Sequence, residues 1–238
     1  QGWTGLSLAL QSYLKAAYCV IDWLAALSKK HGRKINIRLI KGAYWDSEIK
    51  ESQEWGLSSF PVFTRKASTD ISFQACAKKL LSMPDYFFPQ FATHNANSVA
   101  LILQLTEGRT DFEFQCLHGM GQALYDQIVP ADKYNIPCRI YAPVGGYEDL
   151  LAYLVRRLLE NGANTSFVNR IIDANTSIER LIADPVSQVE KQESMANPHI
   201  PLPNAIFSDR LNSSGIDLNN QIVCKQLAKD LAQDADKN

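Results

Sequence analysis

The 238-residue sequence is 46% hydrophobic and 21% charged, and its 24 basic and 25 acidic side chains give a formal net charge of -1. This composition is typical of a globular protein with one sizeable core, and it excludes extended disorder. It gives no electrostatic reason to expect nucleic acid as a partner. The apolar runs are shorter than the roughly 18 residues of a membrane-spanning helix, and no signal-peptide pattern precedes them, so we expect neither.

Five cysteines lie far apart and form no Cys-x-x-Cys pair. This spacing argues against a disulfide framework or a zinc ribbon and favours the reducing cytoplasm. The chain begins with Gln1 in sequence that already resembles folded protein, so we expect a fragment of a longer protein.

From about residue 5 to 172, short β-rich runs alternate with longer stretches of helical periodicity, which is typical of βα units in a parallel sheet. The expected strands are Leu6–Leu10, Ile35–Ile40, Gln90–Thr93, Phe112–Leu117 and Cys138–Ala142. The expected helices are Ser12–His31, Asp46–Trp55, Thr69–Met83, Asn97–Thr106, Gly119–Ile128 and Tyr147–Asn161. Beyond residue 173, prolines and a run of Asn, Ser and Asp predict a linker or arm that ends in an amphipathic stretch, Gln221–Leu231.

No expected strand is followed by a Gly-x-Gly-x-x-Gly turn, so an open dinucleotide-binding sheet is disfavoured. A (βα)8 barrel is the better interpretation. In such a barrel the functional groups gather at the carboxyl ends of the strands, and this is where the unusual polar residues of this sequence fall.

The segment 38–46, Arg-Leu-Ile-Lys-Gly-Ala-Tyr-Trp-Asp, closes one expected strand. The strand period of two places Arg38 on one face and Lys41 on the other. Two interpretations stay open. The strand is an edge strand with solvated cations, or Arg38 points into the barrel mouth between the aromatic walls of Tyr44 and Trp45.

Two histidines, His94 and His118, follow neighbouring strands. They could be metal ligands, but no third ligand is obvious at a neighbouring strand end. Asn95 beside His94 favours hydrogen bonding, so we expect no metal.

The helix from Tyr147 has two opposite faces. Its apolar stripe consists of Leu150, Leu151, Leu154, Val155, Leu158 and Leu159, and its polar face of Tyr153, Arg156, Arg157 and Glu160. The polar face is either solvated, with an i,i+4 ion pair, or a clamp in which two guanidinium groups hold one carboxylate.

Taken together, these motifs closely resemble the proline dehydrogenase domain of the bifunctional bacterial flavoenzymes called proline utilization A. The resemblance runs in order from about residue 5 to 207. It rests on segments 38–46, 61–66, 92–96, 112–121, 139–145 and 153–170.

The resemblance implies a distorted (βα)8 barrel of which the chain holds about strands 4 to 8. Residues 1–172 are then a partial barrel, and residues 173–238 are a linker or arm that leads toward an aldehyde dehydrogenase domain outside the chain. It also implies that FAD oxidises L-proline to 1-pyrroline-5-carboxylate and passes electrons to a quinone, in a cytoplasmic protein that can touch the membrane peripherally.

The resemblance assigns roles by matching position. Arg38 and Tyr141 match catalytic positions, Arg38 near flavin N5. The matches to substrate-binding positions are Arg156, Arg157, Glu160, Tyr44 and Leu117. The matches to cofactor-binding positions are Arg38, Gln11, Ile40, Gly42, Trp45, Thr64, Lys66, Thr93, His94, Asn95 and Gln115.

Two other functions stay open. One is a Schiff-base aldolase or lyase in which Lys41 is the nucleophile. The other is a non-catalytic barrel fragment or interaction module, which the missing strands favour. We expect inward-facing Ile37 and Phe114 to lack an opposing layer, and the chain alone to be poorly active.

Overall fold

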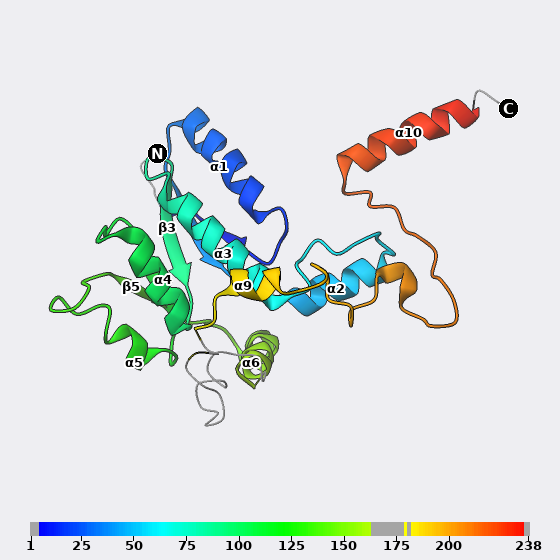
Figure 1. Cartoon of the computed structure of the whole chain (residues 1–238). Helices are drawn as coiled ribbons and strands as arrows, with labels where there is room; N and C mark the ends of the chain where they lie inside the picture. The colour runs from blue at the N-terminus through cyan, green and yellow to red at the C-terminus, as the bar shows by residue number, and fades with distance from the viewer. Residues whose placement is uncertain (1–4, 163–178, 180–181, 236–238) are drawn as a thin grey trace.

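A computed structural model describes residues 5–162, 179 and 182–235, with the backbone alone at 158 and 160–162 (Figure 1). Five parallel strands form one sheet in the order β1-β2-β3-β4-β5. They are β1 (Ser7–Gln11), β2 (Ile35–Ile40), β3 (Phe87–Ala92), β4 (Glu113–Leu117) and β5 (Cys138–Tyr141). The expected α/β fold with a parallel sheet is therefore confirmed.

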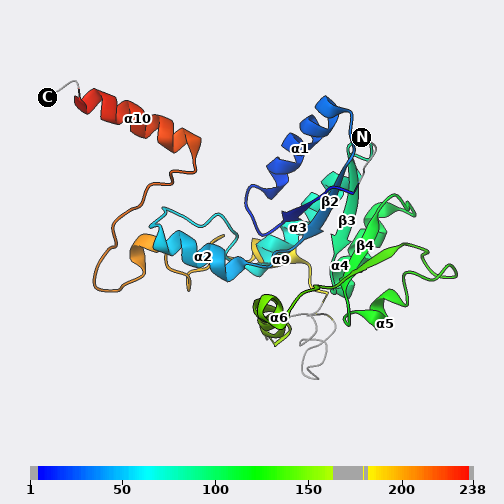
Figure 2. The same cartoon turned by 180° about the vertical axis from the view of Figure 1, so that it is seen from behind.

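The described helices lie mostly between the strands. They are α1 (Ala17–His31), α2 (Trp45–Glu54), α3 (Lys66–Leu81), α4 (Ala96–Thr106), α5 (Gln122–Tyr125), α6 (Tyr147–Gly162), α9 (Pro185–Glu190), the 3-10 helix η1 (Pro203–Ala205) and α10 (Gln221–Ala235). Helices α1, α3 and α4 cover one face of the sheet, and α10 stands apart from it (Figure 1). Seen from behind, the opposite face of the sheet has none of the described helices over it (Figure 2). None of the helices in the described residues is long and apolar enough to cross a membrane.

The main core lies between the sheet and the helices that cover it. The strand register aligns Leu39, Phe91 and Phe114 in one row, and all three are fully buried. Phe91, Phe112 and Phe114 pack with ring centroids 5.5–6.4 Å apart, in the tilted and edge-on arrangements that aromatic rings prefer. The helices therefore already cover this face of the sheet.

The expectation that Ile37 and Phe114 point inward without an opposing layer is wrong. Both side chains are 0% exposed and belong to the core beneath the helices. Since side chains alternate along a strand, the residues next to them, Arg38 and Gln115, take the open face. The uncovered face of the sheet is therefore polar where the sequence was interpreted as apolar.

Helix α1 begins at Ala17, five residues later than predicted, because the preceding residues make long-range contacts. Leu14 pairs with Val62 in an antiparallel bridge, and the Phe63 N–H donates to the Tyr13 carbonyl at 2.8 Å. These bonds hold the connection between α2 and α3 against the carboxyl end of β1.

Residues 182–220, which we call the arm, run back along the body of the protein. Helix α9 packs against α3, and η1 packs against α2. Asp184 caps α9 by accepting from the Val186 and Ser187 N–H groups, and Pro185 occupies its first turn. The arm therefore contains two short helices that the linker pattern did not predict.

Candidate functional site

Arg38 lies on the open face of β2, with its guanidinium held in place. Its Nε donates to Gln115 Oε1 at 2.6 Å, and its Cζ lies 5.0 Å from the centroid of the Tyr141 ring. Strand β2 lies between β1 and β3, so the interpretation of an edge strand with solvated cations is wrong. Arg38 instead joins β2 to β4 and β5 across the uncovered face.

Below Arg38, a polar network centred on Glu113 crosses the sheet. The Glu113 carboxylate accepts from Gln90 Nε2 and Gln115 Nε2, each at 2.8 Å, and from two guanidinium nitrogens of Arg139 at 2.8 and 2.9 Å. Ser7 extends the network to β1 by donating to Gln90 Oε1 at 2.6 Å. Gln115 thus has its amide nitrogen fixed by Glu113, and its oxygen is presented to Arg38.

Glu113 is ionised in this network. Burial alone would raise the pKa of Glu113, but the hydrogen bonds from Arg139, Gln115 and Gln90 hold that pKa below its usual value. The sequence analysis did not identify Glu113 or Gln90. The available signal was the alternation Glu-Phe-Gln in β4, which places two polar groups on one face of a strand whose other face is buried.

His94 follows β3 and serves as a hydrogen-bond acceptor. Its Nε2 accepts from the Leu117 N–H at 3.0 Å. Burial lowers the pKa of His94, and the charge of Arg157 lowers that pKa further, so the ring is neutral. Asn95 accepts from two N–H groups at the start of α4, and Thr93 Oγ1 accepts from the Asn95 N–H at 3.1 Å.

His118 follows β4, but no contact brings its side chain to His94. Among the described residues, no group of three or more His, Cys, Asp or Glu side chains could hold a metal ion.

Helix α6 turns its polar face toward the carboxyl ends of the strands. The Arg156 Cζ lies 5.3 Å from the centroid of the Tyr44 ring, and Arg157 lies close enough to His94 and Tyr141 to shift the pKa of both. The apolar stripe faces away, since Leu151 and Leu159 are 58% and 69% exposed. The polar face lies against the strand ends and is only partly exposed, so the interpretation of a fully solvated polar face is wrong. The side chain of Glu160 lies outside the described part of the structure.

Tyr141 and Leu117 complete this end of the sheet. Burial raises the pKa of Tyr141, against the opposing charges of Arg157 and Arg38, so the phenol is neutral. Leu117 is buried at the end of β4, in register with Tyr141. Arg157 and the Tyr141 ring thus lie near each other at this end of the sheet, with Leu117 in register beside Tyr141.

A cavity of about 430 Å³ opens beside these residues, between the end of β2 and the start of α3. Its lining includes Tyr13, Lys41, Gly42, Trp45, Phe63, Thr64, Arg65, Lys66 and Thr69. Gly42 has φ = 151°, and a Cβ there would lie 1.4 Å from the Tyr13 ring, so only glycine fits. Trp45 Nε1 donates to the Phe63 carbonyl at 2.8 Å and fixes the indole against the wall.

Asp70 holds the two lysines of this cavity. Its carboxylate accepts from Lys41 Nζ at 2.5 Å and from Lys66 Nζ at 2.8 Å. Burial lowers the pKa of Lys41, although Asp70 opposes that shift. Burial by itself would raise the pKa of Asp70, but the two lysine charges bring that pKa below its usual value. One carboxylate shared by two ammonium groups leaves the cavity a net positive charge.

Most of the residues expected to form the site are therefore brought together at one end of the sheet. Arg38, Tyr44, Thr93, His94, Asn95, Gln115, Leu117, Tyr141, Arg156 and Arg157 lie around the ends of β2 to β5. Gly42, Trp45, Thr64 and Lys66 line the adjoining cavity. Gln11 and Ile40 pair at the ends of β1 and β2, where Gln11 Oε1 accepts from the Ala43 N–H at 3.1 Å. Glu113, Gln90, Asp70 and Tyr13 belong to the same region and were not predicted.

Sequence comparison identifies the family of this chain. The model of the proline dehydrogenase family matches residues 1–170, and the chain belongs to this family. The resemblance stated from the sequence motifs is therefore confirmed.

Similar proteins extend well beyond the chain. It is 53% identical to the bifunctional protein PutA of Klebsiella aerogenes, over 98% of this chain and 19% of that protein. It is 31% identical to proline dehydrogenase 1 of Bacillus subtilis strain 168, over 68% of this chain and 47% of that protein. A crystal structure of proline utilization A from Bradyrhizobium japonicum superposes with a TM-score of 0.90 at 50% identity, over 98% of this chain and 24% of that one. The chain thus spans about a fifth of the length of its bifunctional curated relatives.

Proposed function

We propose that the protein containing this chain oxidises L-proline to 1-pyrroline-5-carboxylate with FAD as the bound oxidant and a quinone as the final acceptor. The observation that carries this proposal is the orientation of α6, which aims Arg156 and Arg157 at the strand ends and leaves its apolar stripe exposed. An amphipathic helix is expected to bury its apolar face. The reversed orientation is understandable if the arginines bind a ligand.

The ligand that suits these groups is a small amino acid with an apolar ring. Two guanidinium groups match the geometry of one carboxylate, and Tyr44, Tyr141 and Leu117 supply apolar surface for the ring. A solved structure of a related proline utilization A protein is described as having proline bound in remote sites, so proline is a ligand of that relative.

The cavity beside α3 suits the phosphate groups of FAD. It is lined by Lys41, Arg65 and Lys66, and the first turn of α3 contains no acidic residue to repel an anion. The N–H groups at the start of a helix favour negative charge. Thr64 and Trp45 add a hydroxyl group and an indole ring, which suit the polar and aromatic parts of a dinucleotide.

When bound, FAD would supply the two-electron oxidation, by accepting a hydride from the carbon next to the proline nitrogen while that nitrogen loses a proton. The protein side chains bind and orient the proline. Arg156 and Arg157 hold the carboxylate, and Arg38, fixed by Gln115, presents a rigid donor on the open face. Tyr141 and Leu117 keep water from the reacting carbon. The quinone then takes up two electrons and two protons and becomes a quinol.

The sheet itself is proposed to be about strands 4 to 8 of a distorted (βα)8 barrel. The consecutive strand order supports this, because a doubly wound sheet reverses its order at a switch point. Residues 1–172 would form the partial barrel and 173–238 the linker or arm. We also propose a cytoplasmic location, with peripheral membrane contact during quinone reduction.

The Schiff-base alternative has less support. Lys41 is partly buried, lies over the Phe73 ring and has its ammonium bound to Asp70, whereas a Schiff-base lysine needs a free amine facing the substrate.

Steady-state kinetics of Arg156→Met and Arg157→Met in the intact protein test the proposal. Each variant removes charge-assisted contacts of about 1.5 to 3 kcal/mol, so the KM for L-proline should rise at least tenfold while bound flavin is retained. Arg33→Met, on the exposed connection before β2, is the matched control and should leave the KM unchanged. Wild-type KM in both site variants would refute the clamp.

A further inference from the structure

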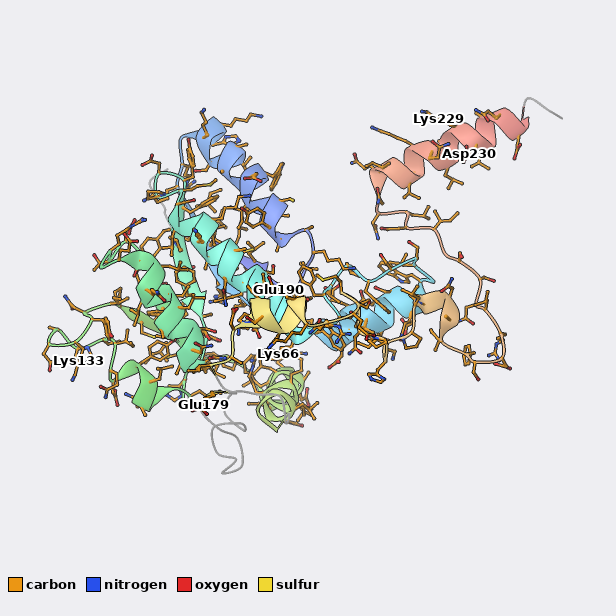
Figure 3. The ribbon with its side chains drawn as sticks, viewed as in Figure 1. Lys66, Lys133, Glu179, Glu190, Lys229 and Asp230 are labelled. Atoms are coloured by element: carbon orange, nitrogen blue, oxygen red, sulfur yellow. The ribbon has the colours of Figure 1, made fainter. Side chains whose placement is uncertain are left out.

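The arm returns to the cavity that the proposed function assigns to FAD. Helix α9 packs against α3, whose first turn carries Lys66, and Lys66 lies beside α9 in Figure 3. Further along the arm, Ile200 packs on the small apolar cluster of Tyr13, Ile49, Phe60 and Val62. Residues 191–200 are therefore anchored at both ends, against α3 and beneath the α2–α3 connection.

Between these anchors, the arm makes two hydrogen bonds to the cavity wall. The Asn197 N–H donates to Thr64 Oγ1 at 2.9 Å, and Arg65 Nε donates to the Ala196 carbonyl at 3.1 Å. Thr64 and Arg65 both line the cavity. The arm thus bonds to two side chains that line the cavity.

The backbone of this wall is held by two other hydrogen bonds, both at Phe63. The Phe63 N–H donates to the Tyr13 carbonyl at 2.8 Å, and Trp45 Nε1 donates to the Phe63 carbonyl at 2.8 Å. None of these bonds acts on the side chains of Thr64 or Arg65. Within the part of the chain that the structure describes, the hydrogen bonds to these two side chains come from Ala196 and Asn197.

The bond to Thr64 also determines what its hydroxyl can do. A hydroxyl that accepts from a backbone N–H keeps its own proton for another acceptor. Since its oxygen accepts from the Asn197 N–H, the Thr64 hydroxyl has its own proton left to donate to a ligand in the cavity that Thr64 lines. A β-branched side chain has few rotamers, so a single bond is enough to select one.

The arm lies beyond the residues 1–170 that the family model matches. We propose that it is nevertheless a working part of the cofactor site, in which the backbone N–H of Asn197 positions the Thr64 hydroxyl, and the Ala196 carbonyl positions Arg65, for binding of FAD. This inference rests on the proposed function. A binding site whose groups are already oriented binds more tightly, since less side-chain freedom is lost on binding.

The test compares Asn197→Pro, which removes the N–H, with Asn197→Ala, which keeps it. Both lose the side-chain oxygen that accepts from the His199 N–H, so the pair isolates the backbone donor. FAD is titrated into the flavin-free form of the intact protein, and binding is followed by flavin fluorescence. Asn197→Pro should weaken FAD binding about tenfold relative to Asn197→Ala, the size expected for one net hydrogen bond. The KM for proline of the flavin-saturated enzyme should not change.

A double-mutant cycle separates positioning from general damage. In a Thr64→Val background the N–H has no hydroxyl to orient, so Asn197→Pro should weaken FAD binding no further. Additive losses, or FAD affinities within twofold for Asn197→Pro and Asn197→Ala, would overturn the inference.

If Asn197→Pro fails to fold, the Arg65→Lys variant tests the inference instead. It keeps the charge but loses the Nε donor, and unchanged FAD affinity refutes the role of the arm. Failure of the wild-type protein to bind FAD would instead refute the proposed function.

Discussion

Replacing Glu113 with glutamine should destabilise the sheet, because the carboxylate is the common acceptor for three strands. Glutamine offers one carbonyl oxygen where four donors converged, from Gln90, Gln115 and Arg139. Three of these donors share Oε1, so a glutamine carbonyl in its place still accepts from them, but without the charge. Its NH2 group replaces the oxygen that accepts from the second guanidinium nitrogen of Arg139, so the loss of that bond and the weakening of the others cost about 1 to 3 kcal/mol. The ion pair adds at most about 1 kcal/mol, since the Arg139 side chain is 63% exposed.

The total loss of about 1 to 4 kcal/mol should lower the melting temperature by about 3 to 15 °C for a chain of this size. Circular dichroism of Glu113→Gln and of the exposed control Glu51→Gln measures it, and the control should melt with the wild type. The folded pKa of Glu113 is lowered, so its contribution is present above the unfolded pKa of about 4.3 and disappears as the pH falls through the folded value. A Glu113→Gln protein that melts within about 2 °C of the wild type at neutral pH would refute the network.

Three other predictions use the same structure. Asp70→Asn leaves partly buried Lys41 without its counter-ion and should destabilise the protein by about 1 to 3 kcal/mol in urea unfolding. An unchanged midpoint would contradict the shared-carboxylate arrangement. The folded pKa of His94 is lowered, so its stabilising effect is present above the unfolded value of about 6.5 and is lost as the pH falls through the folded pKa. His94→Gln should therefore flatten the dependence of the free energy of unfolding on pH. An equal slope in both proteins would count against this role of His94. The 238-residue chain produced alone should melt cooperatively, because Ile37 and Phe114 are already buried, and a gradual, non-cooperative transition would show that the sheet needs further chain.

Local patterns predicted most of the elements. Strand β2 has the predicted bounds, Ile35–Ile40, because branched residues recur at alternate positions, Ile35, Ile37 and Leu39, shortly before a glycine turn. Helix α4 begins where Asn95 caps it, and α1 ends at Gly32 with φ = 57°. Where an element depends on neighbouring residues alone, sequence reasoning located it.

Elements shaped by distant contacts were misplaced. Residues 12–15 have helical periodicity but bond to residues 60–63, which delays α1. Strand β3 begins at Phe87, earlier than predicted. Pro89 interrupts the strand pattern in the sequence, but the buried residues on either side of it keep this segment in the sheet. Helix α5 is limited to Gln122–Tyr125, where a longer helix was predicted.

The site shows the same division. Arg38 could be identified as a charge within an apolar strand, and His94 from its position just after one. The role of Glu113 could not, because it depends on the register that brings Gln90 and Gln115 to the same carboxylate. The orientation of α6 could not be predicted either, since the amphipathic pattern of a helix does not show which of its faces contacts a ligand.

The most direct test of the proposed function is the visible absorption spectrum of the purified intact protein, recorded without oxygen before and after addition of L-proline. The account predicts a bound flavin whose oxidised absorption band disappears on addition of L-proline and returns when a quinone is added. A protein without flavin, or a bound flavin that L-proline leaves oxidised, would contradict it.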